Sequence, residues 1–143
     1  MLKNIPKIVS PELIKTLCAM GHGDEIVIAD GNFPAETFGK RVIRADGISG
    51  TAMLDAVLSL IPFDTYSDPN FILMRLMECD EGKINPEIWK EYEEIAEKHD
   101  KNVKIGNIDR FAFYERAKTA YAVIATGEEA VYANIILKKG VIK

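Results

Sequence analysis

The sequence is poor in cysteine and histidine, and these shortages limit the chemistry that it can support. The 143 residues include only 2 cysteines and 2 histidines. Two cysteines are too few for a secreted scaffold held together by several disulfides. Because Cys18 and Cys79 both fall on apolar segments, we expect reduced, buried thiols in a cytoplasmic protein, and neither a disulfide nor a catalytic cysteine.

Motifs for metal and nucleotide binding are missing. The chain contains no His-x-x-x-His pair and no Cys-x-x-Cys pair that would anchor a metal ion. It also lacks the glycine-rich phosphate loops Gly-x-Gly-x-x-Gly and Gly-x-x-x-x-Gly-Lys. The sequence therefore predicts no metal site and no cofactor.

Positive charge and long hydrophobic runs are in short supply as well. Lys and Arg number 18 against 22 Asp and Glu, which gives a net charge of -4 and no basic run that could track a phosphate backbone. The longest apolar stretch, residues 56–61, is far shorter than the roughly 20 residues that span a bilayer. The first residues lack the apolar core of a secretory signal. We expect neither nucleic acid nor a membrane as a partner.

The residues that are present describe an ordinary folded domain. Hydrophobic residues make up 48% and charged residues 28% of the chain, as in globular proteins generally. At about 150 residues per domain, the length predicts a single domain over residues 1–143.

Helical and strand patterns alternate along this domain. Capping residues Ser10, Ser49 and Asp109 precede helical spacing of apolar residues, and a further helix opens at residues 85–87 and ends near His99. Short apolar runs predict strands at residues 25–30, 71–77 and 103–105, and a C-terminal hairpin from residues 121–126 and 131–137. We predict a three-layer α/β/α domain with a mostly parallel, mixed sheet that ends in this hairpin.

Two polar residues lie beside the first predicted strand. His22 stands between two glycines, which leave its imidazole uncrowded, although a histidine in the turn that ends a helix is an equally good reading. Asp30 lies at the carboxyl end of the strand, the usual ligand edge of an α/β sheet. The alternative for Asp30 is a carboxylate that caps the following turn.

Two further pairs are placed together by periodicity. Arg110 and Tyr114 are four residues apart on a helix, so they share a face. Tyr132 and Asn134 are two apart on a strand, so they share a side of the sheet, where they could also simply bond neighbouring backbone. Arginine, tyrosine, asparagine, aspartate and histidine together offer the directional donors and acceptors that a neutral, polyhydroxylated ligand needs.

Five segments, in order along the chain, carry a family resemblance. They are residues 20–25 (Met-Gly-His-Gly-Asp-Glu), 30–34 (Asp-Gly-Asn-Phe-Pro), 44–47 (Arg-Ala-Asp-Gly), 110–117 (Arg-Phe-Ala-Phe-Tyr-Glu-Arg-Ala) and 132–140 (Tyr-Ala-Asn-Ile-Ile-Leu-Lys-Lys-Gly). Together they resemble the RbsD/FucU family of sugar mutarotases over nearly the whole chain, and most closely its L-fucose branch. Asn32 departs from the family pattern, in which a second histidine often stands at this position.

The resemblance implies an RbsD-like fold and a cofactor-free isomerase that interconverts the α and β anomers of a monosaccharide. It makes His22 the proton donor and Tyr114 a second acid or base. The sugar-binding residues that it implies are Asp30, Asp64, Arg110, Tyr132 and Asn134. It also implies a homo-oligomeric ring, often a decamer. A D-ribose mutarotase and a non-catalytic monosaccharide-binding module on the same fold are the alternatives.

The predicted strand between His22 and Asp30 constrains how the site is assembled. At about 3.3 Å per residue, an extended strand would place these two residues on the order of 20 Å apart. They cannot both touch one sugar within one subunit unless the strand bends. We therefore expect a site at a subunit interface, with His22 from one chain and part of the sugar cradle from the next.

Overall fold

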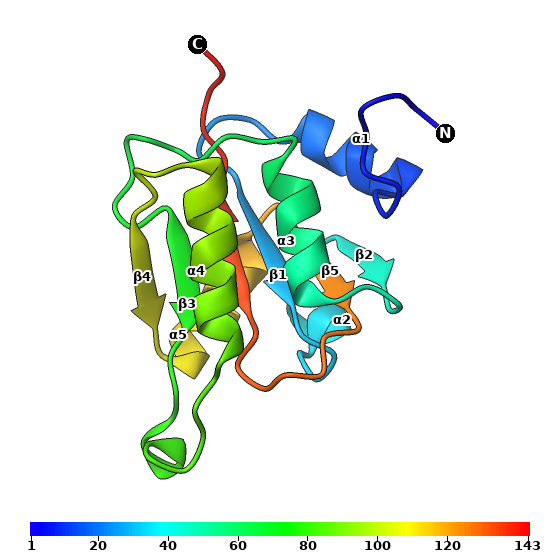
Figure 1. Ribbon diagram of the computed structural model, residues 1–143. Coiled ribbons are helices and arrows are strands. Elements are labelled where there is room, and N and C mark those ends of the chain that lie inside the picture. Colours follow the sequence, from blue (N-terminus) through cyan, green and yellow to red (C-terminus); the bar gives the residue numbers. More distant parts are fainter.

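The computed structural model describes residues 1–143 and contains one six-stranded sheet in the order β2-β5-β1-β6-β3-β4 (Figure 1). Its strands are β1 (Glu25–Ala29), β2 (Val42–Ala45), β3 (Phe71–Met74), β4 (Ile105–Ile108), β5 (Ala122–Thr126) and β6 (Ile135–Lys138). β1 pairs with β5, β5 with β2 and β3 with β4 in parallel, whereas β6 runs antiparallel to both β1 and β3. The prediction of a mostly parallel, mixed sheet is confirmed.

Helices cover both faces of the sheet. They are α1 (Pro11–Ala19), α2 (Ala35–Phe38), α3 (Gly50–Leu58), α4 (Ile88–His99) and α5 (Arg110–Thr119), with a short 3-10 helix, η1 (Glu78–Asp80). Along β1, Ile26 and Ile28 belong to the core beneath α1, α3 and α4, while Val27 and Ala29 belong to the core beneath α2 and α5. Since successive strand residues face opposite sides, a continuous apolar strand fills both cores. This is the predicted three-layer arrangement.

Local signals placed the helix starts correctly. The side chain of Ser10 accepts a hydrogen bond from the backbone N–H of Leu13, and Ser49 accepts one from Ala52. Asp109 caps α5 by accepting from two backbone N–H groups at 3.0 Å. Each cap satisfies donors that the first helical turn leaves unpaired.

The C-terminal hairpin is a wrong prediction. β5 and β6 do not pair with each other, because β1 lies between them and pairs with both. The connection from Thr126 to Ile135 is longer than a tight hairpin loop of two to five residues, and it carries the chain past the end of β1. The apolar patterns of β5 and β6 predicted two strands correctly, but not that both strands pair with β1.

The exposure of the cysteines differs from the prediction too. Cys18 and Cys79 are both free thiols, as expected, but both are exposed and not buried. Cys18 lies on the solvent side of α1, and Cys79 lies in η1, outside the sheet. Beside Cys18 it is Leu17 that enters the core, whereas η1 has no buried residue at all.

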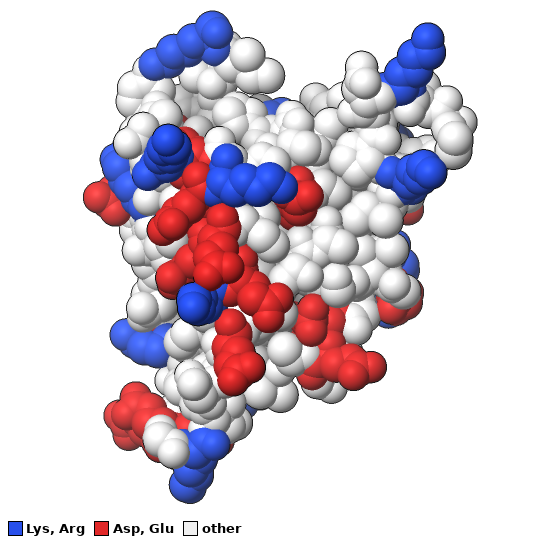
Figure 2. Space-filling model, in the orientation of Figure 1, with Lys and Arg blue, Asp and Glu red and all other residues white.

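The surface of α4 follows its amphipathic sequence. Tyr92 and Ala96 are fully buried against the sheet. Figure 2 shows acidic side chains gathered over this helix, on the side away from the sheet. None of the helices is both long enough and apolar enough to cross a bilayer.

Candidate active site

The predicted site residues form two separate groups at opposite edges of the sheet. Asp30 follows the carboxyl end of β1, and Asn134 precedes β6, which runs the other way, so the two meet at one edge. His22 precedes β1 and therefore lies at the other edge. The five residues of β1 separate the groups by about 17 Å, at ~3.3 Å per residue. The expected separation of His22 from Asp30 within one chain is confirmed.

A cleft of about 170 Å³ opens at the first edge. It brings together Asp30, Arg110, Tyr114, Tyr132 and Asn134, which are five of the seven predicted site residues. Its remaining lining consists of Asn32, Phe33, Met74 and Val131. The cleft thus lies at the carboxyl ends of parallel strands, the general position of ligand sites in α/β sheets.

Asp30 and Asn134 form a buried polar pair at the floor of the cleft. The backbone N–H of Asp30 donates to Oδ1 of Asn134 at 2.8 Å, and Nδ2 of Asn134 donates to Oδ2 of Asp30 at 2.9 Å. The backbone N–H groups of Asn32 and Ala133 donate to the two oxygens of the Asp30 carboxylate. Burial raises the pKa of Asp30 above its ordinary value, and these hydrogen bonds oppose the rise.

The contact predicted between Arg110 and Tyr114 is present on one wall of the cleft. Nε of Arg110 donates to the phenolic oxygen of Tyr114 at 2.8 Å. The ring of Tyr114 stacks on Phe38 with the centroids 4.8 Å apart and meets Phe33 edge-on at 5.5 Å. The guanidinium is therefore the donor, which leaves the phenolic hydrogen of Tyr114 free to point at a ligand.

His22 belongs to a second group of polar residues. Its Nε2 lies 3.0 Å from Oδ1 of Asp64, while its side chain remains 46% exposed. Asp64 is buried and also accepts from the Ser67 hydroxyl at 2.5 Å and from the backbone N–H of Tyr66 at 3.1 Å. The Ser67 hydroxyl and then His22 lower the pKa of Asp64 to about 2, so this carboxyl is ionised at neutral pH.

The ionised Asp64 fixes the state of the imidazole. A carboxylate can only accept, so Nε2 of His22 carries a hydrogen, and Nδ1 is the nitrogen available to exchange a proton. Asp64 does not line the cleft that contains Asp30. These contacts favour a role for Asp64 in orienting His22, and not in binding the sugar directly.

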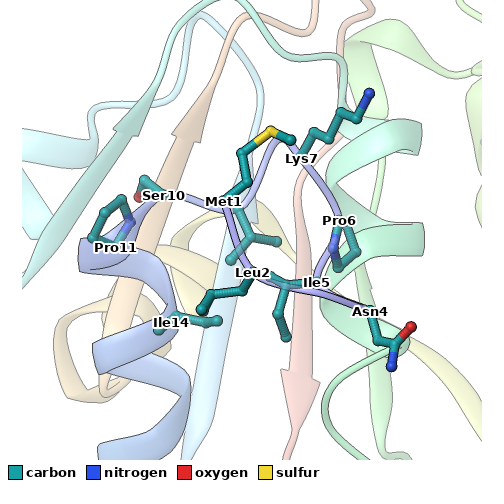
Figure 3. Close-up of a pocket in the computed structure, with 10 residues that line it drawn as sticks. Met1, Leu2, Asn4, Ile5, Pro6, Lys7, Ser10, Pro11 and Ile14 are labelled. Atoms are coloured by element: carbon teal, nitrogen blue, oxygen red, sulfur yellow. The ribbon is translucent and has the colours of Figure 1, made fainter.

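A cavity larger than the cleft lies elsewhere in the molecule. It measures about 630 Å³ and is formed by the N-terminal segment and the start of α1. Figure 3 shows Leu2, Ile5 and Ile14 on its apolar side, with Lys7 pointing away. It contains none of the predicted site residues.

Sequence reasoning missed several residues that line the cleft. Phe33, Met74 and Val131 gave no chemical signal because apolar residues in such positions are read as core. Asn32 was noticed only as a departure from the family pattern. Ser67, which supports Asp64, falls in a loop with no motif.

No group of three or more His, Cys, Asp or Glu side chains is arranged to hold a metal ion.

Known proteins resemble this chain over its full length. Residues 3–142 match the model of the RbsD / FucU transport protein family. Fucose mutarotase from Mus musculus is 50% identical over 143 residues, which cover 97% of this chain and 94% of the mouse protein. The crystal structure of the fucose mutarotase in complex with L-fucose from Streptococcus pneumoniae superimposes with a TM-score of 0.94 at 47% identity and covers 99% of this chain and 100% of that one.

A more distant structure shares the same architecture. Bacillus subtilis RbsD, complexed with D-ribose, superimposes with a TM-score of 0.72 at 25% identity, over 100% of both chains. The full-length match to the family model and the identity to the mouse protein agree with the five sequence segments that carry the resemblance. The chain belongs to the RbsD/FucU family.

Proposed function

We propose that this protein is an L-fucose mutarotase, a carbohydrate isomerase that interconverts the α and β anomers of the sugar without a cofactor. The observation that carries the proposal is the cleft at the carboxyl end of β1. Hydrogen-bond donors and acceptors surround it, and its volume suits one monosaccharide. The names of the mouse and streptococcal relatives support L-fucose as the sugar.

The reaction needs only proton transfer. A proton is delivered to the ring oxygen while another leaves the anomeric hydroxyl, so the bond from C1 to the ring oxygen breaks as the C1 carbonyl forms. Rotation about the C1–C2 bond then lets the ring close on the other face of the carbonyl, with the protons returned. One positioned acid or base contributes about 10²–10⁴ in rate, and mutarotation already proceeds in water.

The residues divide between proton transfer and sugar binding. His22 acts as the proton donor through Nδ1, since its Nε2 is engaged by Asp64. Tyr114 acts as the second acid or base, with Arg110 holding its oxygen. Asp30, Tyr132 and Asn134, together with Arg110, bind sugar hydroxyls.

Two copies of the chain complete each site in this proposal. His22 lies at the edge of the sheet opposite to the cleft, so it serves the cleft of a neighbouring copy. Exposed apolar residues occur at both edges: Tyr66 contacts the His22 ring at a centroid distance of 5.5 Å, and Val131 lines the cleft. Contact between unlike surfaces is head-to-tail and closes into a ring when the rotation allows. We propose such a ring, with a decamer as the size implied by the family resemblance.

The same features suggest a setting for the protein. Residues 1–143 act as one mutarotase domain, because a single sheet uses strands from both ends of the chain. Exposed free thiols at Cys18 and Cys79 suit the reducing cytoplasm. We therefore place the protein in the cytoplasm as part of the proposal.

Saturation-transfer NMR on equilibrated sugars tests the activity. We expect enhanced exchange between the anomers of L-fucose, and little exchange with the His22→Ala variant. The His99→Ala variant is the matched control, because His99 bonds Asp55 between α3 and α4 and lies outside both groups. Enhanced exchange of D-ribose alone would point to a ribose mutarotase, and binding without exchange would point to a non-catalytic module.

Mixed oligomers test whether the site is shared. Neither the His22→Ala nor the Asn134→Ala protein alone should exchange fucose efficiently. Mixed oligomers should recover part of the activity, because some interfaces combine an intact His22 with an intact cleft. Protein mixed only with copies carrying the same substitution is the control. No recovery in verified mixed oligomers would show that the two residues act within one chain.

A further inference from the structure

Tyr132 has a backbone conformation that is rare for a residue with a side chain. Its φ is +57°, in the left-handed region that favours glycine. Nε1 of Trp89 donates to the carbonyl of Tyr132 at 2.8 Å, and the hydroxyl of Tyr92 donates to the next carbonyl, that of Ala133, at 3.1 Å. Two aromatic donors from α4 thus hold the turn that directs Tyr132 into the cleft.

The phenol of Tyr132 is held at its other end by η1. Its hydroxyl donates to the carboxylate of Asp80, and the backbone N–H of Met77 points to the phenolic oxygen at 3.4 Å. The same segment reaches Arg110, whose Nη1 donates to the sulfur of Met77 at 3.4 Å. η1 extends beyond the sheet at the end where the cleft opens (green in Figure 1).

A phenol has one hydrogen to donate, and here that hydrogen is given to Asp80. The phenolic oxygen receives only the long contact of 3.4 Å from the Met77 N–H, so it keeps acceptor capacity for a ligand in the cleft that Tyr132 lines. Resting on the proposed function, we infer that Asp80 is a positioning residue, which turns Tyr132 into a hydrogen-bond acceptor for one hydroxyl of the bound sugar. Neither Asp80 nor Trp89 lines the cleft, so both act through Tyr132.

The electrostatics of the pair agree with this assignment. Burial, and next the hydrogen bond to Asp80, raise the pKa of Tyr132 above that of an ordinary phenol. Tyr132 therefore remains protonated at neutral pH and does not serve as a base. Its function is to bind and orient, which leaves proton transfer to His22 and Tyr114.

A measurement without sugar tests the orientation of the phenol. The 5 tyrosines are labelled with ¹³C at Cζ, and the Tyr132 resonance is identified by its loss in Tyr132→Phe. In Asp80→Ala we expect this resonance to shift and its titration to move to lower pH. Glu78→Ala removes an equal charge from an exposed position in the same short helix and should leave both unchanged. An unaltered Tyr132 titration in Asp80→Ala would overturn the inference.

Affinity for L-fucose tests the use of that orientation. Loss of one hydrogen bond predicts that Asp80→Ala and Tyr132→Phe each weaken binding about 3- to 10-fold. If Asp80 acts only through Tyr132, the double variant binds no more weakly than Tyr132→Phe alone. Asp80→Asn retains an oxygen acceptor and should bind within about 2-fold of the parent protein.

The outcomes separate this inference from the proposed function. Affinity losses that multiply in the double variant would show that Asp80 acts independently of Tyr132, against the inference. A parent protein that neither binds nor exchanges L-fucose would contradict the proposed function. The Tyr132 titration, which uses no sugar, would still decide whether Asp80 sets the orientation of the phenol.

Discussion

The substitution Asn134→Asp should make the stability of the protein depend strongly on pH. Nδ2 of Asn134 lies 2.9 Å from Oδ2 of Asp30, and both residues are buried. The substitution replaces this donor by an oxygen, so two carboxylates would face each other. At this distance, with an effective dielectric constant of about 20, two negative charges repel by about 6 kcal/mol.

Protonation relieves that repulsion. Because about 1.4 kcal/mol is a factor of ten in proton affinity, a cost of about 6 kcal/mol raises the upper pKa of the pair far above that of an ordinary carboxyl. The pair therefore keeps one proton at pH 7 in the folded protein, whereas the unfolded chain, with carboxyl pKa values near 4, has released it. Since the folded state binds the extra proton, the variant loses about 1.4 kcal/mol of stability for each unit by which the pH rises from 5 to 7.

Urea denaturation at pH 5, 6 and 7, followed by the fluorescence of Trp89, measures the effect. Trp89 is the only tryptophan and bonds Tyr132, close to the substituted residue. Relative to the parent protein, the variant should gain up to about 2.7 kcal/mol between pH 7 and pH 5. The raised pKa of Asp30 makes the stability of the parent protein depend on pH with the same sign. The change in the parent protein is therefore subtracted from the change in the variant.

The control is Asn134→Ala, which removes both hydrogen bonds between Asn134 and Asp30 without adding a charge. It should be less stable at every pH, by about 1–3 kcal/mol for each buried partner left unpaired. Because Asn134 no longer opposes the raised pKa of Asp30, the control should gain a pH dependence of the same sign, but smaller than that of Asn134→Asp. All proteins are compared at one concentration because subunit association contributes to stability. If Asn134→Asp has the same pH dependence as the parent, the buried pair does not exist as described.

Three further substitutions test other parts of the molecule. Tyr114→Phe should leave the Kd for L-fucose nearly unchanged but slow anomer exchange by about 10²–10⁴, and unchanged exchange by NMR would remove Tyr114 from the mechanism. The folded-state pKa of Asp64 lies below the unfolded value, so its contribution of at most about 2 kcal/mol is present above pH 4 and is lost as pH falls to about 2. Asp64→Asn should lack that component in urea denaturation between pH 5 and pH 2, and an unchanged acid profile would contradict it. A Cβ at Gly50 would lie 1.9 Å from the hydroxyl of Tyr92, so Gly50→Ala should lower the free energy of unfolding by about 1–3 kcal/mol, while Gly47→Ala, whose Cβ meets nothing within 4 Å, should not. Equal stability of the two alanine variants would show that α3 yields easily at this contact.

Local interactions were predictable because their physics lies within a few residues. The caps at Ser10, Ser49 and Asp109 each bond an N–H two or three residues ahead. The contact between Arg110 and Tyr114 follows from one helical turn. In these cases the sequence spacing itself sets the distance between the groups.

Contacts between distant segments were not predictable in this way. His22 and Asp64 are 42 residues apart in the sequence, and Tyr132 and Asp80 are 52 apart. Neither pair follows from periodicity, because loops outside the regular elements bring the partners together. The family resemblance supplied the residues His22 and Asp64, but only the fold shows that the two contact each other.

The short elements β2 and α2 were missed for a related reason. Each has a single fully buried residue among its four, so neither shows the continuous apolar run that marked β3 and β6. Both become regular through their neighbours: β2 pairs with β5, and Ala35 of α2 is buried in the core beneath α5. Here tertiary packing decides the structure of a segment whose own preferences are weak.

The wrong hairpin prediction bears directly on the site. Had β6 paired with β5, Asn134 would lie beside β5, away from the end of β1, and could not bond Asp30. Because β6 runs antiparallel beside β1, the residue before its start, Asn134, lies next to Asp30. At the other end of β6, the carbonyl of Lys138 accepts a hydrogen bond from the backbone N–H of Asp64. One reversed strand therefore contacts both groups of polar residues, which the length of β1 keeps at opposite edges of the sheet. This length of β1, between His22 and Asp30, is the reason why the proposed site requires a second copy of the chain.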